Sequence, residues 1–511
     1  MLKRWSQTGL RSDGMSSSKS SGAAKGPPHI VIINPDQWRS DVMGHMGNPA
    51  AVTPNLDHCV RTDGVSFKNA FCQNPVCTPS RCSFMTGWYP HVRGHRTMTH
   101  MLRPDEPMLL KTLKDSGYFV WWGGKNDVVP AQNGFEAYCS RKHVPLRPLA
   151  IGNSNRWKAT PGDTPGSDTY YSFYKGHQKI PSNETCCYDN DWDIVYGAIE
   201  QIKNAPVGQP LCIYLPLEFP HPPYGVEDPW YSMIDTAKVP PRIPTPESWE
   251  GLPSILKGIH DRQHMQGWSE ERWQELRRTY YGMCSRVDHQ FGLVVNALRQ
   301  VGMYDDTAIF FFSDHGDFTG DYGLVEKTQN TFQDCLTHVP FIIKPPAKTP
   351  LQPRISSALV ELIDFSATVE ALTGIQPKHT HFGRSLLPVL AGTSDTHRDA
   401  VFCEGGRLHG ETHCMELGLG PESQYWPRIS LECGEGPEHM KSVMCRTHEY
   451  KYVRRHSDSD ELYDLRNDPG ECQNRINDPK LASVLAQLKE RLLTFYMETG
   501  DVVPHELDKR W

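Results

Sequence analysis

The residues best suited to chemistry lie in the stretch 71–90. Cys77 stands there between Pro75 and Pro79, and Arg81 follows four residues later. The prolines hold Cys77 on an extended turn, because residues that precede proline avoid the helical region. A helix can begin directly afterwards at residues 83–86, and a side chain at such a point lies near free backbone N–H groups and the positive helix end. A nucleophile or an anion would be stabilised there, although a buried structural thiol fits the same local pattern.

Further polar residues follow segments that read as buried strands. Because ligands collect beyond the carboxyl ends of parallel strands, we expect these side chains to meet. Two carboxylates and an imidazole would suit a divalent cation. A single aspartate at a strand end is more often a turn former or a helix cap, so the hypothesis depends on the whole set. Its members are Asp36 with Gln37, Lys125 with Asp127, His221, and Asp314 with His315.

With these companions, the pattern Cys77-x-Pro79-x-Arg81 followed by Gly87 resembles the signature of the type I sulfatases, in which the cysteine is converted to formylglycine. The other segments resemble family elements in the same order along residues 29–475. Asp36-Gln37 and Asp314-His315-Gly316 are similar to the two metal pairs. Gly123-Gly124-Lys125 resembles the family's substrate-binding element, and His221-Pro222 resembles its catalytic His-Pro segment. Lys327 resembles the lysine that follows the second metal pair, and residues 461–471 resemble the C-terminal signature.

The resemblance implies a mechanism and its cofactors. The hydrate of formylglycine at position 77 would attack sulfur, Arg81 would orient it, Lys125 and Lys327 would neutralise the transferring group, and His221 would protonate the leaving alcohol. One divalent metal ion would be held by Asp36, Gln37, Asp314, His315 and the modified Cys77. Calcium is the ion typical of the family, with manganese or zinc as alternatives. The implied partners are a small-molecule sulfate ester and a formylglycine-generating enzyme.

The sequence also departs from the common sulfatase pattern. Gln37 stands where many members have aspartate, His315 where many have asparagine, and Asp127 where many have histidine. The site is therefore less anionic and softer, and it leans toward the phosphonate monoester hydrolase and choline-sulfatase-like members. Hydrolysis of sulfate monoesters is the leading hypothesis. The alternatives are a phosphonate monoester or phosphodiester hydrolase with the same apparatus, and an unmodified, inactive member that acts as a binding protein.

Strand and helix patterns alternate along the chain, which predicts an α/β fold. The resemblance implies an alkaline-phosphatase-like arrangement, in which helices sandwich a large, mixed, mostly parallel sheet. We expect irregular structure over 145–182 and 240–253. The predicted strands are 29–33, 65–67, 118–122, 211–215, 307–312 and 339–343, and the predicted helices are 53–61, 108–116, 270–301 and 357–372.

Three regions are expected in the 511 residues: a disordered segment 1–28, a catalytic domain 29–395 and a smaller C-terminal α+β subdomain 396–511. A formal net charge of −7 argues against nucleic acid as a partner, and no window suggests a membrane span. The first 28 residues lack the apolar run of a secretory signal, and the 15 cysteines form no CxxC pair. We therefore predict reduced cysteines and a cytosolic location, and we leave a homo-oligomer open.

Overall fold

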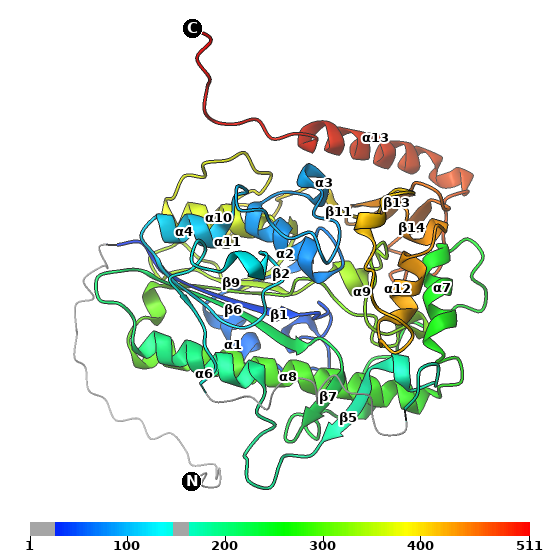
Figure 1. The fold of residues 1–511 in the computed structure, drawn as a ribbon, viewed down its shortest axis with the longest axis horizontal. Coiled ribbons are helices and arrows are strands. Elements are labelled where there is room, and N and C mark those ends of the chain that lie inside the picture. Colours follow the sequence, from blue (N-terminus) through cyan, green and yellow to red (C-terminus); the bar gives the residue numbers. More distant parts are fainter. Residues whose placement is uncertain (1–25, 147–162) are drawn as a thin grey trace.

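The computed structural model describes residues 26–146 and 163–511, which are built around an eight-stranded sheet (Figure 1). The strand order is β10-β2-β9-β8-β1-β6-β3-β4, and within this sheet of the described residues β9 alone runs antiparallel to its neighbours. The strands are β1 (His29–Asp36), β2 (Val65–Phe71), β3 (Phe119–Trp122), β4 (Arg141–Lys142), β6 (Leu211–Pro220), β8 (Thr307–Phe312), β9 (Phe341–Lys344) and β10 (Arg354–Glu361).

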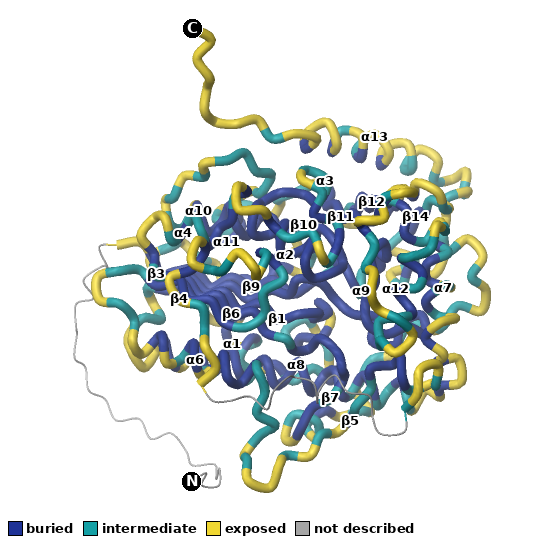
Figure 2. The backbone as a smooth tube through the Cα atoms, viewed as in Figure 1, coloured by how far each residue is buried: buried dark blue, intermediate teal, exposed yellow. Residues whose placement is uncertain are grey.

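Helices cover both faces of this sheet, because its central strands carry apolar side chains on both sides. In β1, Ile30 and Ile32 pack into one core, whereas Val31 and Ile33 pack into the other. The first core is closed by α2 (Cys77–Thr86), α4 (Leu109–Asp115), α10 (Asp364–Thr373) and α11 (Leu387–Leu390). The second is closed by α1 (Pro54–Thr62), α6 (Asn190–Lys203) and the long α8 (Glu270–Gln300). Figure 2 shows the buried sheet between these two layers.

A second, antiparallel sheet follows in the C-terminal part, with strands β11 (Val401–Gly405), β12 (Ser442–Arg446), β13 (Tyr450–Arg455) and β14 (Glu461–Asp464). The last helix, α13 (Ala482–Thr499), packs on it through Phe495, whose ring stacks on Phe402 at 4.0 Å. The smaller elements are α3 (Pro90–Arg93), β5 (Tyr174–Gln178) paired with β7 (Tyr224–Glu227), α7 (Ser254–Gln263), α9 (Asp334–Thr337) and α12 (Trp426–Glu432).

A group of charged side chains joins the two sheets. Asp334 in α9 accepts from Arg446 at 2.9 Å and from Lys451 at 2.6 Å, and Lys451 also pairs with Glu471. Glu471 belongs to the C-terminal segment whose sequence resembles the family signature. That segment therefore anchors the loop that runs from β8 to β9.

The predicted fold class is confirmed, including the smaller C-terminal sheet. The predicted helix 357–372 is wrong in its first half, because residues 354–361 form β10 beside β2 and α10 begins only at Asp364. Tertiary pairing has overridden an apolar spacing that also fits a helix. The predicted irregular segment 145–182 contains β5, while its residues 147–162 lie outside the described part, as do residues 1–25 of the predicted disordered segment.

All fifteen cysteines are free thiols, and ten of them are buried. Among the described residues, no helix is both long and apolar enough to cross a membrane. The domain division at residue 396 stays a prediction.

Candidate active site

Cys77 is the first residue of α2, so the predicted helix start at residues 83–86 is wrong by six residues. Pro79 is tolerated in the first turn of a helix, where its missing N–H has no intrahelical partner to lose, so only Val76 stays extended. Val76 is extended with φ −136°, and its N–H donates to the side chain of Asn74 at 3.0 Å. The amide of Asn74 in turn donates to the carbonyl oxygen of Glu404 at 2.7 Å, so the second sheet supports the turn. The helix ends at Gly87, whose φ of 72° is left-handed and favours glycine. The thiol is therefore held at a helix N-terminus inside the molecule.

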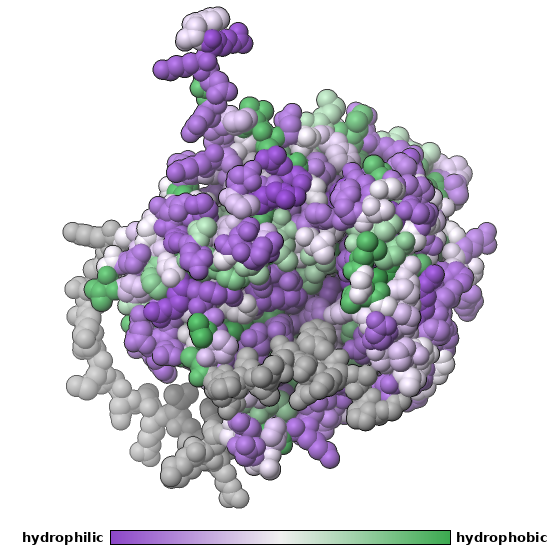
Figure 3. All heavy atoms as spheres, in the orientation of Figure 1, coloured by the Kyte–Doolittle hydropathy of each residue, from purple (hydrophilic) through white to green (hydrophobic). Residues whose placement is uncertain are grey.

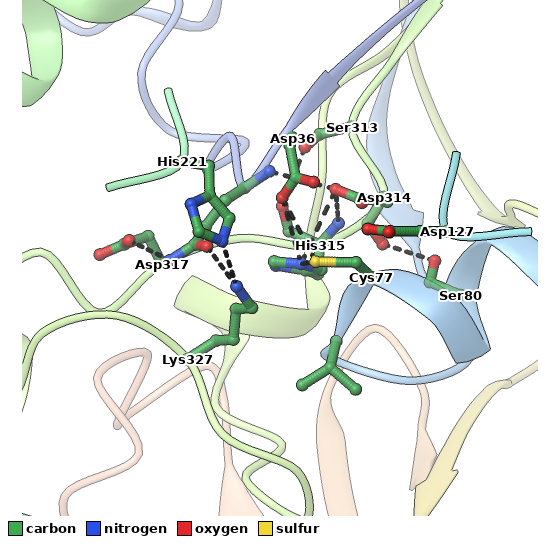
Figure 4. Close-up of polar contacts among 12 residues, drawn as sticks. Asp36, Cys77, Ser80, Asp127, His221, Ser313, Asp314, His315, Asp317 and Lys327 are labelled. Carbon is green, nitrogen blue, oxygen red and sulfur yellow. Dashed lines mark hydrogen bonds and ion pairs between the residues drawn. The ribbon is translucent and has the colours of Figure 1, made fainter. Parts of the chain in front are cut away.

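The Cys77 thiol lies beside Asp36 and His315 (Figure 4), and Lys125 approaches it from a third strand end. Its Sγ lies 3.2 Å from Nε2 of His315, 3.5 Å from Oδ1 of Asp36 and 3.6 Å from Nζ of Lys125. Asp36 ends β1, His315 follows β8 and Lys125 follows β3, all at the carboxyl edge of the sheet. Burial and the nearby Asp36 carboxylate raise the pKa of the thiol, so it is protonated at neutral pH.

Arg81 lies one helical turn after Cys77 and balances the buried carboxylates. Its guanidinium donates to Asp314 at 2.8 Å and to Asp36 at 3.1 Å, and a further N–H donates to the Tyr214 hydroxyl at 3.3 Å. Burial by itself would raise the pKa of Asp36, but the charges of Lys125 and Arg81 outweigh it and hold that pKa well below its usual range. Asp36 is therefore ionised.

Four of these residues could hold a metal ion. Asp36, Cys77, Asp314 and His315 each offer a ligand atom, and these atoms lie within 4.8 Å of one another. The ring of His315 donates from Nδ1 to the carbonyl oxygen of Gly316 at 2.9 Å, and burial lowers its pKa, so Nε2 presents a lone pair to the cluster. Ionised oxygen donors and a neutral imidazole fit a divalent cation.

Gln37 and Lys327 lie on one side of the cluster. The amide oxygen of Gln37 accepts from Nζ of Lys327 at 2.8 Å, and its amide nitrogen donates to Asp317 at 2.5 Å. Gln37 has a left-handed φ of 69°, and its carbonyl oxygen accepts from the Tyr280 hydroxyl at 2.7 Å. The predicted ligand is thus close to the cluster, with its amide bonded to protein groups.

His221 and Lys327 share a hydrogen bond of 2.8 Å between Nε2 and Nζ, while Nδ1 of His221 donates to the Pro222 carbonyl oxygen at 2.7 Å. Burial and the Lys327 charge hold the pKa of His221 well below its usual range. The pKa of Lys327 is raised, because the Glu326 carboxylate, 2.8 Å away, opposes the effect of burial. At neutral pH the pair therefore carries its proton on Lys327.

Lys125 is positioned by the tight turn that follows β3. Gly124 has a φ of 52°, and a Cβ there would lie 2.4 Å from the carbonyl oxygen of Pro216, so only glycine fits. The Lys125 ammonium pairs with Asp36 and, at 3.0 Å, with Asp127. The negative charge of Asp127, which departs from the family pattern, is thus balanced inside the site.

Two supporting residues escaped the sequence analysis. The Tyr224 hydroxyl donates to Asp317 at 2.9 Å and accepts from the N–H of Glu326 at 2.9 Å, which ties the Gln37 side to the Lys327 loop. The position of Asp317, two residues after His315, was the available signal for it. No sequence signal pointed to Tyr224, because a tyrosine in such a segment usually packs in the hydrophobic core.

Several histidines and tryptophans near these segments in the sequence have structural contacts outside the cluster. His91 bonds to Glu404 and His95 pairs with Glu106, away from the cluster. Trp121 and Trp122 are 2% and 0% exposed and belong to the two cores that flank the sheet.

This geometry defines a nucleophile position at a helix N-terminus inside a metal-ligating cluster, and the comparisons with known proteins identify the family. The Sulfatase family model matches residues 28–375, and the model of the N-sulphoglucosamine sulphohydrolase C-terminal region matches residues 435–498. The chain therefore belongs to the sulfatase family. It is a sulfuric ester hydrolase of the alkaline phosphatase superfamily, as the residues predicted. Members of this family generally use formylglycine and a metal ion.

Individual relatives are distant but match over most of their length. The multifunctional alkaline phosphatase superfamily protein PehA of Trinickia caryophylli is 24% identical over 93% of this chain and 96% of its own, and human arylsulfatase K is 23% identical over 95% and 85%. Among solved structures, the phosphonate monoester hydrolase of Agrobacterium radiobacter has a TM-score of 0.72 at 21% identity, covering 94% of this chain and 100% of its own. The 2-O GAG sulfatase BT1596 has a TM-score of 0.67 at 22% identity, covering 93% of both chains. These structures share the fold.

Proposed function

We propose that this protein hydrolyses sulfate monoesters to an alcohol and inorganic sulfate, with formylglycine at position 77 as the source of the nucleophile. The observation that carries the proposal is the placement of Cys77 Sγ, 3.2 Å from His315 and 3.5 Å from Asp36 at the start of α2. An unmodified thiol with a raised pKa would be a poor nucleophile at this place. The hydrate of formylglycine supplies a hydroxyl group at the same position.

Asp36, Asp314 and His315 are the proposed metal ligands, together with the modified residue 77. Gln37 would join them once its amide oxygen turned from Lys327 toward the cluster. When bound, the ion supplies positive charge that polarises the sulfuryl oxygens and lowers the pKa of a hydroxyl beside it. Calcium is the ion typical of the family, and the imidazole of His315 makes manganese or zinc an alternative.

The other residues act on charge and on the proton. Arg81 orients the group at position 77 while it pairs with Asp36 and Asp314, and Lys125 faces the same group from the end of β3. Lys327 and His221 form the acid side of the site, because a proton on Lys327 can pass along their 2.8 Å hydrogen bond. An anionic substrate beside His221 would favour its charged form, which can then donate to the leaving oxygen.

Mass spectrometry of the tryptic peptide that contains Cys77 tests the proposal. We expect formylglycine in the active protein and complete loss of turnover of an aryl sulfate in Cys77→Ala. The matched control is Cys72→Ala, because Cys72 lies in the same peptide but outside the metal-ligating cluster. An active protein that carries only the unmodified thiol would refute the mechanism. An inactive protein that carries only the unmodified thiol would support the hypothesis that this chain is a binding protein.

A phosphonate monoester or phosphodiester hydrolase is the second candidate. The observation that favours it is the pairing of Asp127 with Lys125, which places a carboxylate in a site where many sulfatases have histidine. Parallel measurement of kcat/KM on an aryl sulfate and on the matching aryl phosphonate separates the two. A higher value on the phosphonate would reverse the assignment.

A formylglycine-generating enzyme is the proposed maturation partner. Cys77 is 1% exposed in the folded chain, so the modification must precede the closure of the fold. The fifteen free cysteines support the further proposal of a cytosolic location, where thiols stay reduced. Microscopy of the tagged protein in its native host tests that location.

A further inference from the structure

The chain after α13 leaves the body of the molecule. Residues 500–511 run outward as an extended arm in Figure 1, and Figure 3 shows this arm standing clear of the surface. It carries large apolar side chains that are almost fully exposed: Val503 is 66% exposed, Leu507 95% and Trp511 100%. Such exposure of apolar residues on one segment is typical of a surface that another molecule covers.

A groove of about 480 Å³ lies between α13 and strands β12 and β13. Its floor is apolar, with Val443 and Tyr452 from the sheet and Leu492 from the helix. Leu493 at its edge is 56% exposed. The groove therefore offers an apolar surface that is wide enough for one or two side chains of an extended segment.

One base of the groove complements the acids of the arm. Leu507 stands between Glu506 and Asp508, and the groove is bordered by Lys489 and by Arg454, which pairs with Asp460 of the groove at 2.9 Å. Among the contacts of the described residues, the Lys489 ammonium lies over the Tyr452 ring, 5.8 Å from its centroid, and pairs with no carboxylate. An apolar side chain flanked by acids would satisfy the apolar floor of this groove and place a carboxylate beside Lys489.

We propose that the arm of a second copy of this chain, residues 504–511, docks in this groove with Leu507 on its floor, and that the two copies exchange arms. The copy's own arm is directed elsewhere, because the hydroxyl of Thr380 donates to the Val503 carbonyl oxygen at 2.5 Å and Pro504 follows with a fixed φ. The residues of α13 that line the groove, Lys489 to Tyr496, lie 4 to 11 residues before Gly500, about 6–16 Å along the helix axis. Reciprocal exchange gives a closed dimer with two identical contacts.

Light scattering coupled to size-exclusion chromatography tests the exchange on the full-length protein. We expect a dimer for the full chain and a monomer for a chain that ends at Gly500, with unchanged turnover of an aryl sulfate. A synthetic peptide of residues 500–511 should bind the shortened chain, and the change Leu507→Ala should weaken this binding at least tenfold. A dimer that survives removal of the arm would overturn the proposal.

Exchanging the charges of Lys489 and Asp508 tests whether these two residues contact each other across the dimer. Lys489→Glu should convert the dimer to monomer, and adding Asp508→Lys in the same chain should restore the dimer. Lys480→Glu is the matched control, because Lys480 is exposed but outside the groove. If the full chain is monomeric and refuses the peptide that the shortened chain binds, the arm occupies its own groove and the proposal of a second copy is wrong.

Discussion

The guanidinium of Arg81 lies 2.8 Å from a carboxylate oxygen of Asp314, and neither side chain is exposed to solvent. The same guanidinium reaches Asp36 at 3.1 Å. One buried cation thus serves two buried carboxylates, and Lys125 supplies the second positive charge. A divalent ion would then make this cluster net positive, which suits an anionic substrate.

Replacing Arg81 should therefore reduce both activity and stability. We expect Arg81→Ala to lower kcat/KM on an aryl sulfate by about 10²–10³-fold, because an oriented charge is lost. We also expect it to lower the free energy of unfolding by about 3–5 kcal/mol, because two carboxylates stay buried without their partner. Urea denaturation measures the second effect. Arg61→Ala, at an exposed position of α1, should change neither quantity appreciably; equal effects of the two variants would contradict the assigned role.

Removal of the metal should abolish turnover. After dialysis against a chelator, we expect no activity on an aryl sulfate and a lower Tm, because an ion bound to the folded state stabilises it. Adding calcium, manganese or zinc separately should restore both, and the most effective ion identifies the natural one. Asp314→Asn should weaken the restoring ion's binding. Full activity at a metal content far below one ion per chain would refute the metal site.

The role of His221 can be tested with leaving groups of different basicity. We expect His221→Ala to reduce kcat by about 10²–10⁴-fold for an alcohol that needs protonation, and much less for nitrophenol, which leaves as the anion. The exposed His456→Ala serves as control. If both substrates lose activity equally, His221 only supports the structure, and another residue protonates the leaving group.

Asp334 should make stability depend on pH in the acid range. Burial raises its pKa, but Arg446 and Lys451 outweigh this and hold the pKa below its ordinary value. A carboxylate with a lowered pKa stabilises the fold above about pH 4, and this contribution is lost as the pH falls further. We expect Asp334→Asn to cost about 3 kcal/mol at pH 7 and progressively less from pH 4 to pH 2. Urea denaturation at several pH values measures the loss of unfolding free energy, with Asp395→Asn at an exposed position as the reference. A loss in Asp334→Asn that does not change with pH would contradict the prediction.

The amino-acid sequence by itself determined the family, the fold class and the set of polar residues at the strand ends. Runs such as residues 29–33 and 307–312 specify buried parallel strands by composition, and Asp36 and Asp314 follow them at a fixed place. The prolines around Cys77 did not determine its conformation, because Pro79 is accommodated in the first turn of α2. The tertiary structure decided what local patterns leave open. Residues 357–361 became a strand because β2 offered a partner, although their spacing also fits a helix.

The protonation states were also decided by the tertiary structure. His221 is neutral because it is buried and because the charged Lys327, more than a hundred residues later, donates to its ring. Asp127 is balanced because the Gly124 turn brings Lys125 to within 3.0 Å of it. Spacing along a chain determines which residues reach the same sheet edge, whereas pKa values depend on distances and burial that exist only after the fold closes.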